Sequence, residues 1–288
     1  MALETHTHFY GVDTPEGRKQ LAFQMWQRSA SADAPVLICV HGLTRNRHDF
    51  DEIACALASH YRVVTVDMIG RGDSDWLSDP GHYGYPLYVS LMQQLMTHLA
   101  DITGEDRFDW LGTSMGGLIG MMIAASPATQ IDRLVLNDIG PEIPVSGLKR
   151  LADYVGQAPA FSSLGEVEDY LRVVAAGFGQ LSDAQWRTMA THAARKDELG
   201  SWRLAYDPAI SNAFDGLSED IDLTGIWKLL SCPVLVIRGE QSDLLTEEGL
   251  VRMCERQNTC HVTIPNAGHA PALLSEDEIS AVRDFLAT

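Results

Sequence analysis

One short stretch, Gly112-Thr113-Ser114-Met115-Gly116, constrains the fold of this 288-residue chain more than any other. The apolar residues 107–111 before it predict a short strand, and residues 118–125 after it predict a buried helix. A serine on so sharp a strand-to-helix turn has a strained backbone and an exposed hydroxyl, and flanking glycines leave room for the turn. The pattern is short enough to occur by chance, so a catalytic role for Ser114 needs partners elsewhere in the chain.

The order of the other elements predicts an α/β fold. Residues 9–28 have the pattern of a β-hairpin, and residues 29–34 that of a linker. Strands are predicted at 35–40, 61–67, 131–136, 232–239 and 261–264, and helices at 49–60, 87–102, 247–256 and 276–286. Such alternation is typical of a parallel sheet with right-handed crossovers.

Between residues 140 and 225 this alternation stops. The segment predicts helices at 148–155, 165–176 and 183–194, many aromatic side chains, and no parallel strand. We therefore expect a core domain built from residues 1–139 and 226–288, interrupted by a helical insert at 140–225.

Composition and charge exclude several classes of partner. A net charge of −18 argues against binding to nucleic acid or to an anionic membrane. No apolar run reaches the roughly 18 residues that a membrane span needs, and residues 1–10 have no signal-peptide core. Five scattered cysteines suggest reduced thiols and a cytoplasmic protein. No spacing typical of metal ligands occurs, so neither a metal nor another cofactor is expected.

A serine nucleophile needs a base, and the base needs an acidic group to orient it. In a parallel sheet both should lie in loops at the carboxyl ends of strands. Asp243 follows the strand 232–239, and His269 follows the last strand. The order Ser114, Asp243, His269 is typical of a hydrolase triad. Asp138, at another strand end, is an alternative acid, and Glu240 is a weaker one.

Two backbone N–H groups are expected to bind the oxyanion that forms when the serine attacks. Met115 begins the helix after the serine, so its N–H points toward the reacting atoms. Leu43 lies in the loop after the strand 35–40, which ends at His41-Gly42. We expect Gly42 to let this loop approach the serine closely.

Together these residues resemble the α/β-hydrolase superfamily over essentially the whole chain. The resemblance rests on four motifs: Val40-His41-Gly42-Leu43, residues 67–75, Gly112-Thr113-Ser114-Met115-Gly116-Gly117, and Gly268-His269. It implies an eight-stranded, mostly parallel sheet flanked by helices, with a helical cap inserted after the sixth strand. In such proteins the turn at 70–75 is chiefly structural, so Arg71 and Asp73 are not catalytic candidates.

The resemblance also narrows the chemistry. Epoxide hydrolases and haloalkane dehalogenases of this fold use an aspartate nucleophile, whereas position 114 is serine. Esterases, lactonases, thioesterases and carbon–carbon hydrolases of ring-cleavage diketo acids remain. The carbon–carbon hydrolases commonly have tryptophan after the catalytic histidine, where this chain has Ala270. Hydrolysis of a small or medium carboxylic ester through an acyl-enzyme is therefore the expected reaction, with peracid formation a conceivable side activity.

The substrate and its contacts are open at this stage. Arg45 and Arg47, beyond Leu43, could bind a substrate carboxylate, or could be solvated surface residues. Trp186 and the other aromatic residues of the insert could line a pocket or pack a lid. A small-molecule ester is the expected partner, and the sequence does not determine the oligomeric state. A binding protein that keeps the fold without catalysis is the alternative from another class.

Overall fold

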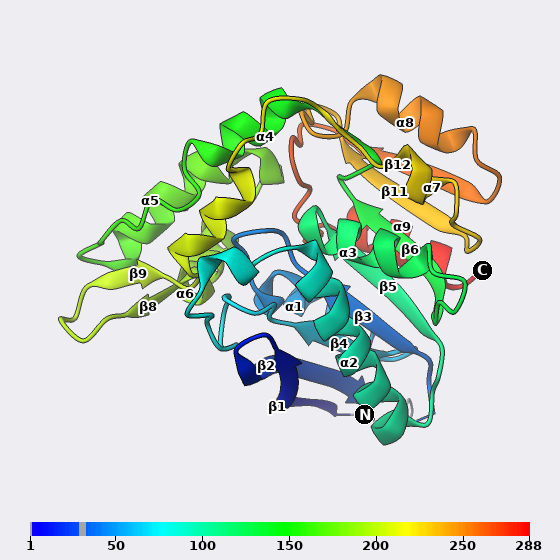
Figure 1. Cartoon of the computed structure of the whole chain (residues 1–288), viewed down its shortest axis with the longest axis horizontal. Helices are drawn as coiled ribbons and strands as arrows, with labels where there is room; N and C mark the ends of the chain where they lie inside the picture. Colours follow the sequence, from blue (N-terminus) through cyan, green and yellow to red (C-terminus); the bar gives the residue numbers. More distant parts are fainter. Residues whose placement is uncertain (1, 29–32) are drawn as a thin grey trace.

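A computed structural model of the chain describes residues 2–28 and 33–288, so most of the predicted linker at 29–34 lies outside the described residues. Its centre is an eight-stranded sheet (Figure 1). The strands lie in the order β1 (Leu3–Thr14), β2 (Gly17–Arg28), β4 (Arg62–Val66), β3 (Val36–Val40), β5 (Phe108–Thr113), β6 (Ile131–Asn137), β11 (Val234–Gly239), β12 (Thr259–Ile264).

This sheet is mostly parallel, as the sequence predicted. β1 and β2 form the hairpin, and β2 pairs antiparallel with β4. Every pairing from β4 through to β12 is parallel. The continuous apolar character of β3 follows from this, since the strand is buried on both faces.

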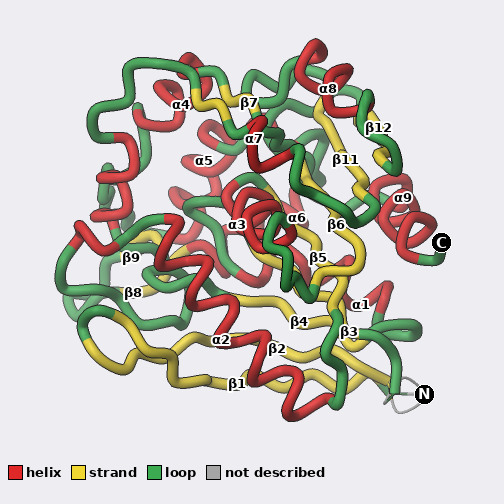
Figure 2. Tube along the Cα trace, turned by 45° about the vertical axis from the view of Figure 1, so that its right-hand side comes forward, coloured by secondary structure: helices red, strands yellow, loops and turns green. Residues whose placement is uncertain are grey.

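Helices cover both faces of the sheet. Ile38 of β3 packs in the apolar cluster on one face, together with α2 (Tyr85–Thr103), α3 (Met115–Ala124) and α8 (Glu247–Cys254). Leu37 packs on the opposite face with α1 (Asp51–Leu57) and α9 (Glu276–Leu286). This switch between neighbouring residues is the two-residue period of a strand. Figure 2 shows α2 and α3 crossing in front of the strands.

The predicted helix at 49–60 is divided in the structure. A short 3-10 helix, η2 (Arg47–Phe50), comes first, and α1 follows it directly. The side chain of Asn46 accepts a hydrogen bond from the N–H of His48 and so begins η2 two residues before the predicted start. A second short 3-10 helix, η3 (Pro80–His82), precedes α2.

The chain between β6 and β11 is largely helical and has its own apolar cluster. It contains β7 (Glu142–Ile143), α4 (Val145–Ala152), α5 (Leu164–Val174), η4 (Ala176–Phe178), α6 (Asp183–Ala193), β8 (Ala194–Lys196), β9 (Trp202–Leu204), η5 (Pro208–Phe214), β10 (Ile221–Asp222) and α7 (Thr224–Trp227). Its short strands pair antiparallel, β8 with β9 and β7 with β10.

Hydrogen bonds attach this segment to the loops at the carboxyl ends of the sheet strands. Asn46, after β3, donates to the carbonyl of His192. Gly72, after β4, donates to Ala205, and Gly268, after β12, donates to Gly177. The segment therefore lies over the edge of the sheet where a parallel α/β fold places its site (Figure 1). Among the described helices, none is both long and apolar enough to cross a membrane.

Candidate active site

Ser114 occupies the strained turn that the sequence predicted. β5 ends at Thr113 and α3 begins at Met115, which leaves Ser114 alone between them with φ 50° and ψ −113°. The turn requires glycine at position 116, because a Cβ there would lie 2.0 Å from the carbonyl oxygen of Val40. The absence of a side chain at position 116 thus lets the turn pack directly against β3, and Ser114 lies at the carboxyl ends of the strands.

A continuous hydrogen-bond relay connects Ser114 to His269 and Asp138. The distance from Ser114 Oγ to His269 Nε2 is 2.9 Å, and His269 Nδ1 donates to Asp138 Oδ2 at 2.7 Å. The Asp138 side chain is fully buried, and that of His269 is 8% exposed. Both ring nitrogens of the histidine are therefore engaged, one by the serine and one by a carboxylate.

Asp138 is held by two further hydrogen bonds. The N–H of Gly239 donates to Oδ1 at 2.7 Å, and the hydroxyl of Ser242 donates to Oδ2 at 2.5 Å. Ser242 Oγ also accepts from the N–H groups of Leu244 and Leu245. The loop after β11 thus fixes this carboxylate through its backbone and a serine that the sequence did not mark as a site residue.

The predicted contact between Asp243 and His269 is wrong. Asp243 instead pairs with Arg150 of α4, at 2.5 Å from Nε to Oδ2 and 2.8 Å from Nη2 to Oδ1, and its side chain is 41% exposed. Partial burial alone would raise the pKa of Asp243, but the hydrogen bonds and charge of Arg150 outweigh burial and lower it. Strand order explains the difference, because β6 lies between β5 and β11 and places Asp138 beside β5, the strand that leads to Ser114.

The loop that carries Leu43 is fixed by a neutral histidine. His41 is completely buried; its Nδ1 lies 2.6 Å from the carbonyl oxygen of Gly42, and its Nε2 accepts from the N–H of Met68 at 3.0 Å. Burial lowers the pKa of His41 to about 3, which outweighs the hydrogen bond to Gly42. The ring therefore stays uncharged and holds the loop in one position.

Gly42 is not needed for the close approach of this loop to Ser114 that the sequence analysis expected. A Cβ at Gly42 would meet its nearest neighbour, Ser114 Cβ, at 3.8 Å, an ordinary contact, so the approach of this loop does not depend on glycine. The same distance places the loop beside Ser114.

Arg71 contacts both expected oxyanion residues: its Nε donates to the carbonyl of Leu43 at 2.8 Å, and its Nη2 lies 3.7 Å from Met115 Sδ.

A cavity opens above Ser114 and His269. Its floor includes Leu43, Arg45 and Thr113, and the rest of its wall comes from the segment between β6 and β11. That wall is mostly apolar or aromatic: Leu151, Tyr154, Val155, Tyr170, Leu171, Val174, Ala175, Phe178, Ala193, Leu204 and Tyr206. The hydroxyl of Tyr170 is buried and has no hydrogen-bond partner among the described residues.

Of the three predicted substrate contacts, only Arg45 lines this cavity. Its Nε and Nη2 are bound to Asp49, the shortest contact being 2.6 Å. Arg47 is buried and pairs with Asp67 and Asp73. Trp186 packs inside the apolar cluster of the insert beneath the guanidinium of Arg172.

Asn137 was also missed by the sequence analysis. Its Nδ2 donates to the carbonyl of Pro271 at 2.8 Å and to Thr113 Oγ1 at 3.0 Å. It therefore joins the loop that carries His269 to the strand before the nucleophile. The sequence did offer one indication of this role, because Asn137 is the last residue of β6 and directly precedes Asp138.

Comparisons with known proteins show the family of this chain. A sequence model of the Alpha/beta hydrolase family matches residues 37–282. The chain is 38% identical over 296 residues to a 3-hydroxybutyrate-oligomer hydrolase of Cupriavidus necator, which covers 99% of each protein. It is 28% identical over 231 residues to an esterase of Mycobacterium tuberculosis, covering 77% of this chain and 72% of that protein.

A solved structure gives the same result for the fold. An α/β hydrolase from Novosphingobium aromaticivorans superposes with a TM-score of 0.87 at 32% identity, covering 99% of this chain and 98% of that one. The matches extend over nearly the whole chain, and the eight-stranded, mostly parallel sheet is consistent with them. This chain is a hydrolase and belongs to the alpha/beta hydrolase family.

Proposed function

We propose that this chain is a serine hydrolase that cleaves carboxylic esters through an acyl-enzyme, with Ser114 as nucleophile, His269 as general base and Asp138 as the orienting acid. The observation that carries the proposal is the relay from Ser114 through His269 to buried Asp138, at 2.9 and 2.7 Å. The first distance lets His269 accept the serine proton, and the second lets Asp138 orient the ring of His269.

The reaction follows from these positions. Ser114 Oγ bonds to the acyl carbon while its proton passes to His269 Nε2, and the carbonyl electrons move onto oxygen. The N–H groups of Leu43 and Met115 stabilise that oxyanion; the latter belongs to the first turn of α3 and has no partner within the helix. His269 then protonates the leaving alcohol. In the second half His269 removes a proton from water, which attacks the acyl carbon. The bond from that carbon to Ser114 Oγ then breaks, the acid leaves, and His269 returns the proton to Oγ.

The insert at 140–225 acts in this proposal as a cap on the core formed by residues 1–139 and 226–288. It supplies most of the cavity wall and is hydrogen-bonded to the loop that carries His269. A cap of this kind excludes water and selects the substrate.

We propose short esters of hydroxy acids as the substrate class. The relative with 38% identity is a 3-hydroxybutyrate-oligomer hydrolase. The cavity supports such a substrate, because its wall is apolar except for a few polar groups, and the unpartnered hydroxyl of Tyr170 can donate to a second ester carbonyl or to a hydroxyl. Recognition of a carboxylate by Arg45 would compete with its ion pair to Asp49.

The test is labelling with a fluorophosphonate, which reacts with an activated serine. We expect the wild-type chain to be labelled and Ser114→Ala to remain unlabelled. Absence of labelling in folded wild-type protein would contradict the mechanism and favour a binding protein that has kept the fold.

Product analysis then separates the reactions. Turnover of aryl esters and of a 3-hydroxybutyrate dimer, without cleavage of a vinylogous diketo acid, is expected for an ester hydrolase. Comparison with a lactone and a thioester tests the remaining alternatives. Tyr170→Phe should lower kcat/KM for the dimer by about tenfold, the cost of one hydrogen bond to a buried group, and leave simple aryl esters unaffected.

A further inference from the structure

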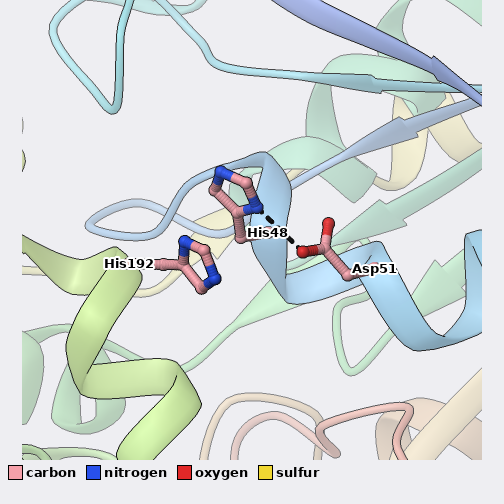
Figure 3. Close-up of side chains that lie close together, drawn as sticks. All are labelled: His48, Asp51 and His192. Atoms are coloured by element: carbon pink, nitrogen blue, oxygen red, sulfur yellow. Dashed lines mark hydrogen bonds and ion pairs between the residues drawn. The ribbon is translucent and has the colours of Figure 1, made fainter. Parts of the chain in front are cut away.

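Three metal-ligand side chains meet beside the active-site cavity, at the contact between the core and the insert (Figure 3). His48 lies in η2, Asp51 is the first residue of α1, and His192 is the last residue but one of α6. One ligand atom from each lies within 4.8 Å of the others, and all three residues are half-buried. Among the described residues, this is the one group of three such side chains.

The imidazole rings of His48 and His192 are stacked on each other. Their ring centroids are 3.8 Å apart at an interplanar angle of 17°. His48 Nδ1 lies 2.8 Å from Asp51 Oδ2. The side chain of Asn46 fixes both backbones, since it accepts from the N–H of His48 and donates to the carbonyl of His192. The backbones that carry the two histidines are therefore held beside each other before any ion binds.

The surroundings favour a cation. Asp51 and Glu52 line the neighbouring cavity together with both histidines, while the charges of Arg45 and Asp49 in the same lining cancel in an ion pair. Asp51 Oδ1 is buried with no hydrogen-bond partner among the described residues, so one carboxylate oxygen is left to bind an ion. Negative charge in such a cleft concentrates cations.

We propose that His48, Asp51 and His192 form a site for one divalent transition-metal ion such as Zn²⁺, which bridges the insert to the core. Two imidazoles and one carboxylate are a ligand set that suits Zn²⁺ and Co²⁺, with water in the remaining position. Bonds of about 2.0–2.2 Å require ligand atoms roughly 3.4 Å apart in a tetrahedral site, so a side-chain rotation of His192 completes the site. The bound ion joins α6 to the segment η2–α1.

Calorimetric titration of the chelator-treated full chain with Zn²⁺ tests the proposal. We expect one saturable site per chain, and visible absorption bands when Co²⁺ is used instead. Asp51→Asn and His192→Asn should each weaken binding by at least about tenfold, since each removes a ligand of the ion. Both variants should retain the circular dichroism spectrum and ester turnover of the metal-free wild-type chain, because neither residue belongs to the proposed catalytic relay.

A matched control distinguishes this site from general surface binding. His6 and His8 form another pair of neighbouring histidines, on β1, with ring centroids 6.4 Å apart. The double variant His6→Asn/His8→Asn should bind Zn²⁺ as the wild type does. Absence of a saturable site, unchanged affinity in Asp51→Asn and His192→Asn, or loss of binding in the control variant would each overturn the proposal.

Hydrogen exchange tests the bridge itself. Saturating Zn²⁺ should slow amide exchange in α6 (Asp183–Ala193) of the wild-type chain and leave α6 of Asp51→Asn unchanged. Binding without slower exchange in the wild type would refute the bridging role.

Discussion

Replacing Asp138 with asparagine should remove almost all of the proposed esterase activity. The carboxylate accepts three hydrogen bonds at 2.5–2.7 Å and is fully buried, so its charge acts on the histidine with little screening. Asparagine would keep the shape, but the N–H of Gly239 would hold its oxygen at the Oδ1 position, so its NH2 group would face His269 Nδ1 and favour the wrong tautomer. Loss of this group in other serine hydrolases costs about 10⁴ in kcat, or about 5.5 kcal/mol of transition-state stabilisation.

Asp243→Asn is the matched control. Its ion pair with Arg150 is about 40% exposed on both sides, and such pairs are worth up to about 1 kcal/mol, so kcat should change by less than about fivefold. Steady-state hydrolysis of an aryl ester, at equal concentrations of folded protein confirmed by thermal unfolding, measures both variants. A drop in kcat for Asp243→Asn as large as that for Asp138→Asn, or a loss below tenfold for Asp138→Asn, would refute the assignment of the acid.

Three further predictions concern the scaffold around the site. Gly116→Ala forces a Cβ against the carbonyl of Val40 and should lower the free energy of unfolding by about 3 kcal/mol, whereas Gly42→Ala should change it by less than about 1 kcal/mol; equal urea midpoints would contradict the packing argument. The buried His41 has a lowered pKa, so the unfolded chain binds the extra proton between about pH 6.5 and 3 and stability falls as the pH falls. Urea unfolding between pH 6 and 4 should therefore show a slope about 1.4 kcal/mol per pH unit steeper in the wild type than in His41→Gln, and parallel slopes would disprove the neutral state. Arg71→Met, which removes the guanidinium that contacts both proposed oxyanion residues, should lower kcat by about tenfold to a hundredfold with little change in KM; an unchanged kcat would show that these residues hold their positions without it.

Much of the fold follows from local sequence patterns. The strand β3 is a continuous apolar run because it is buried on both faces, and α9 was predicted at its observed bounds, Glu276–Leu286. The position of Ser114 between β5 and α3 also followed from the sequence, because glycines at 112 and 116 leave the room that a sharp strand-to-helix turn needs. Periodicity and steric exclusion act over a few residues, so a linear sequence reveals them.

The choice of the orienting acid could not be made in this way. Asp138 and Asp243 both follow sheet strands, and the order of residues along the chain favoured Asp243. The order of strands in space separates the two, since β6 lies beside β5 and brings Asp138 to His269, whereas Asp243 pairs with Arg150 of the insert. An alternative that the sequence left open is thus resolved by a contact between residues 131 positions apart.

The rest of the molecule shows the same difference between features that depend on neighbouring residues and features that depend on distant ones. The sequence by itself determined the strands, the serine elbow and the histidine loop, because each depends on neighbouring residues. Only the tertiary structure paired Arg47 with Asp67, placed Trp186 in the apolar core of the insert, and brought His192 against His48. Side-chain partners depend on how helices and loops pack over the sheet. That packing brings together residues that are far apart along the chain, and no local sequence pattern predicts such pairs.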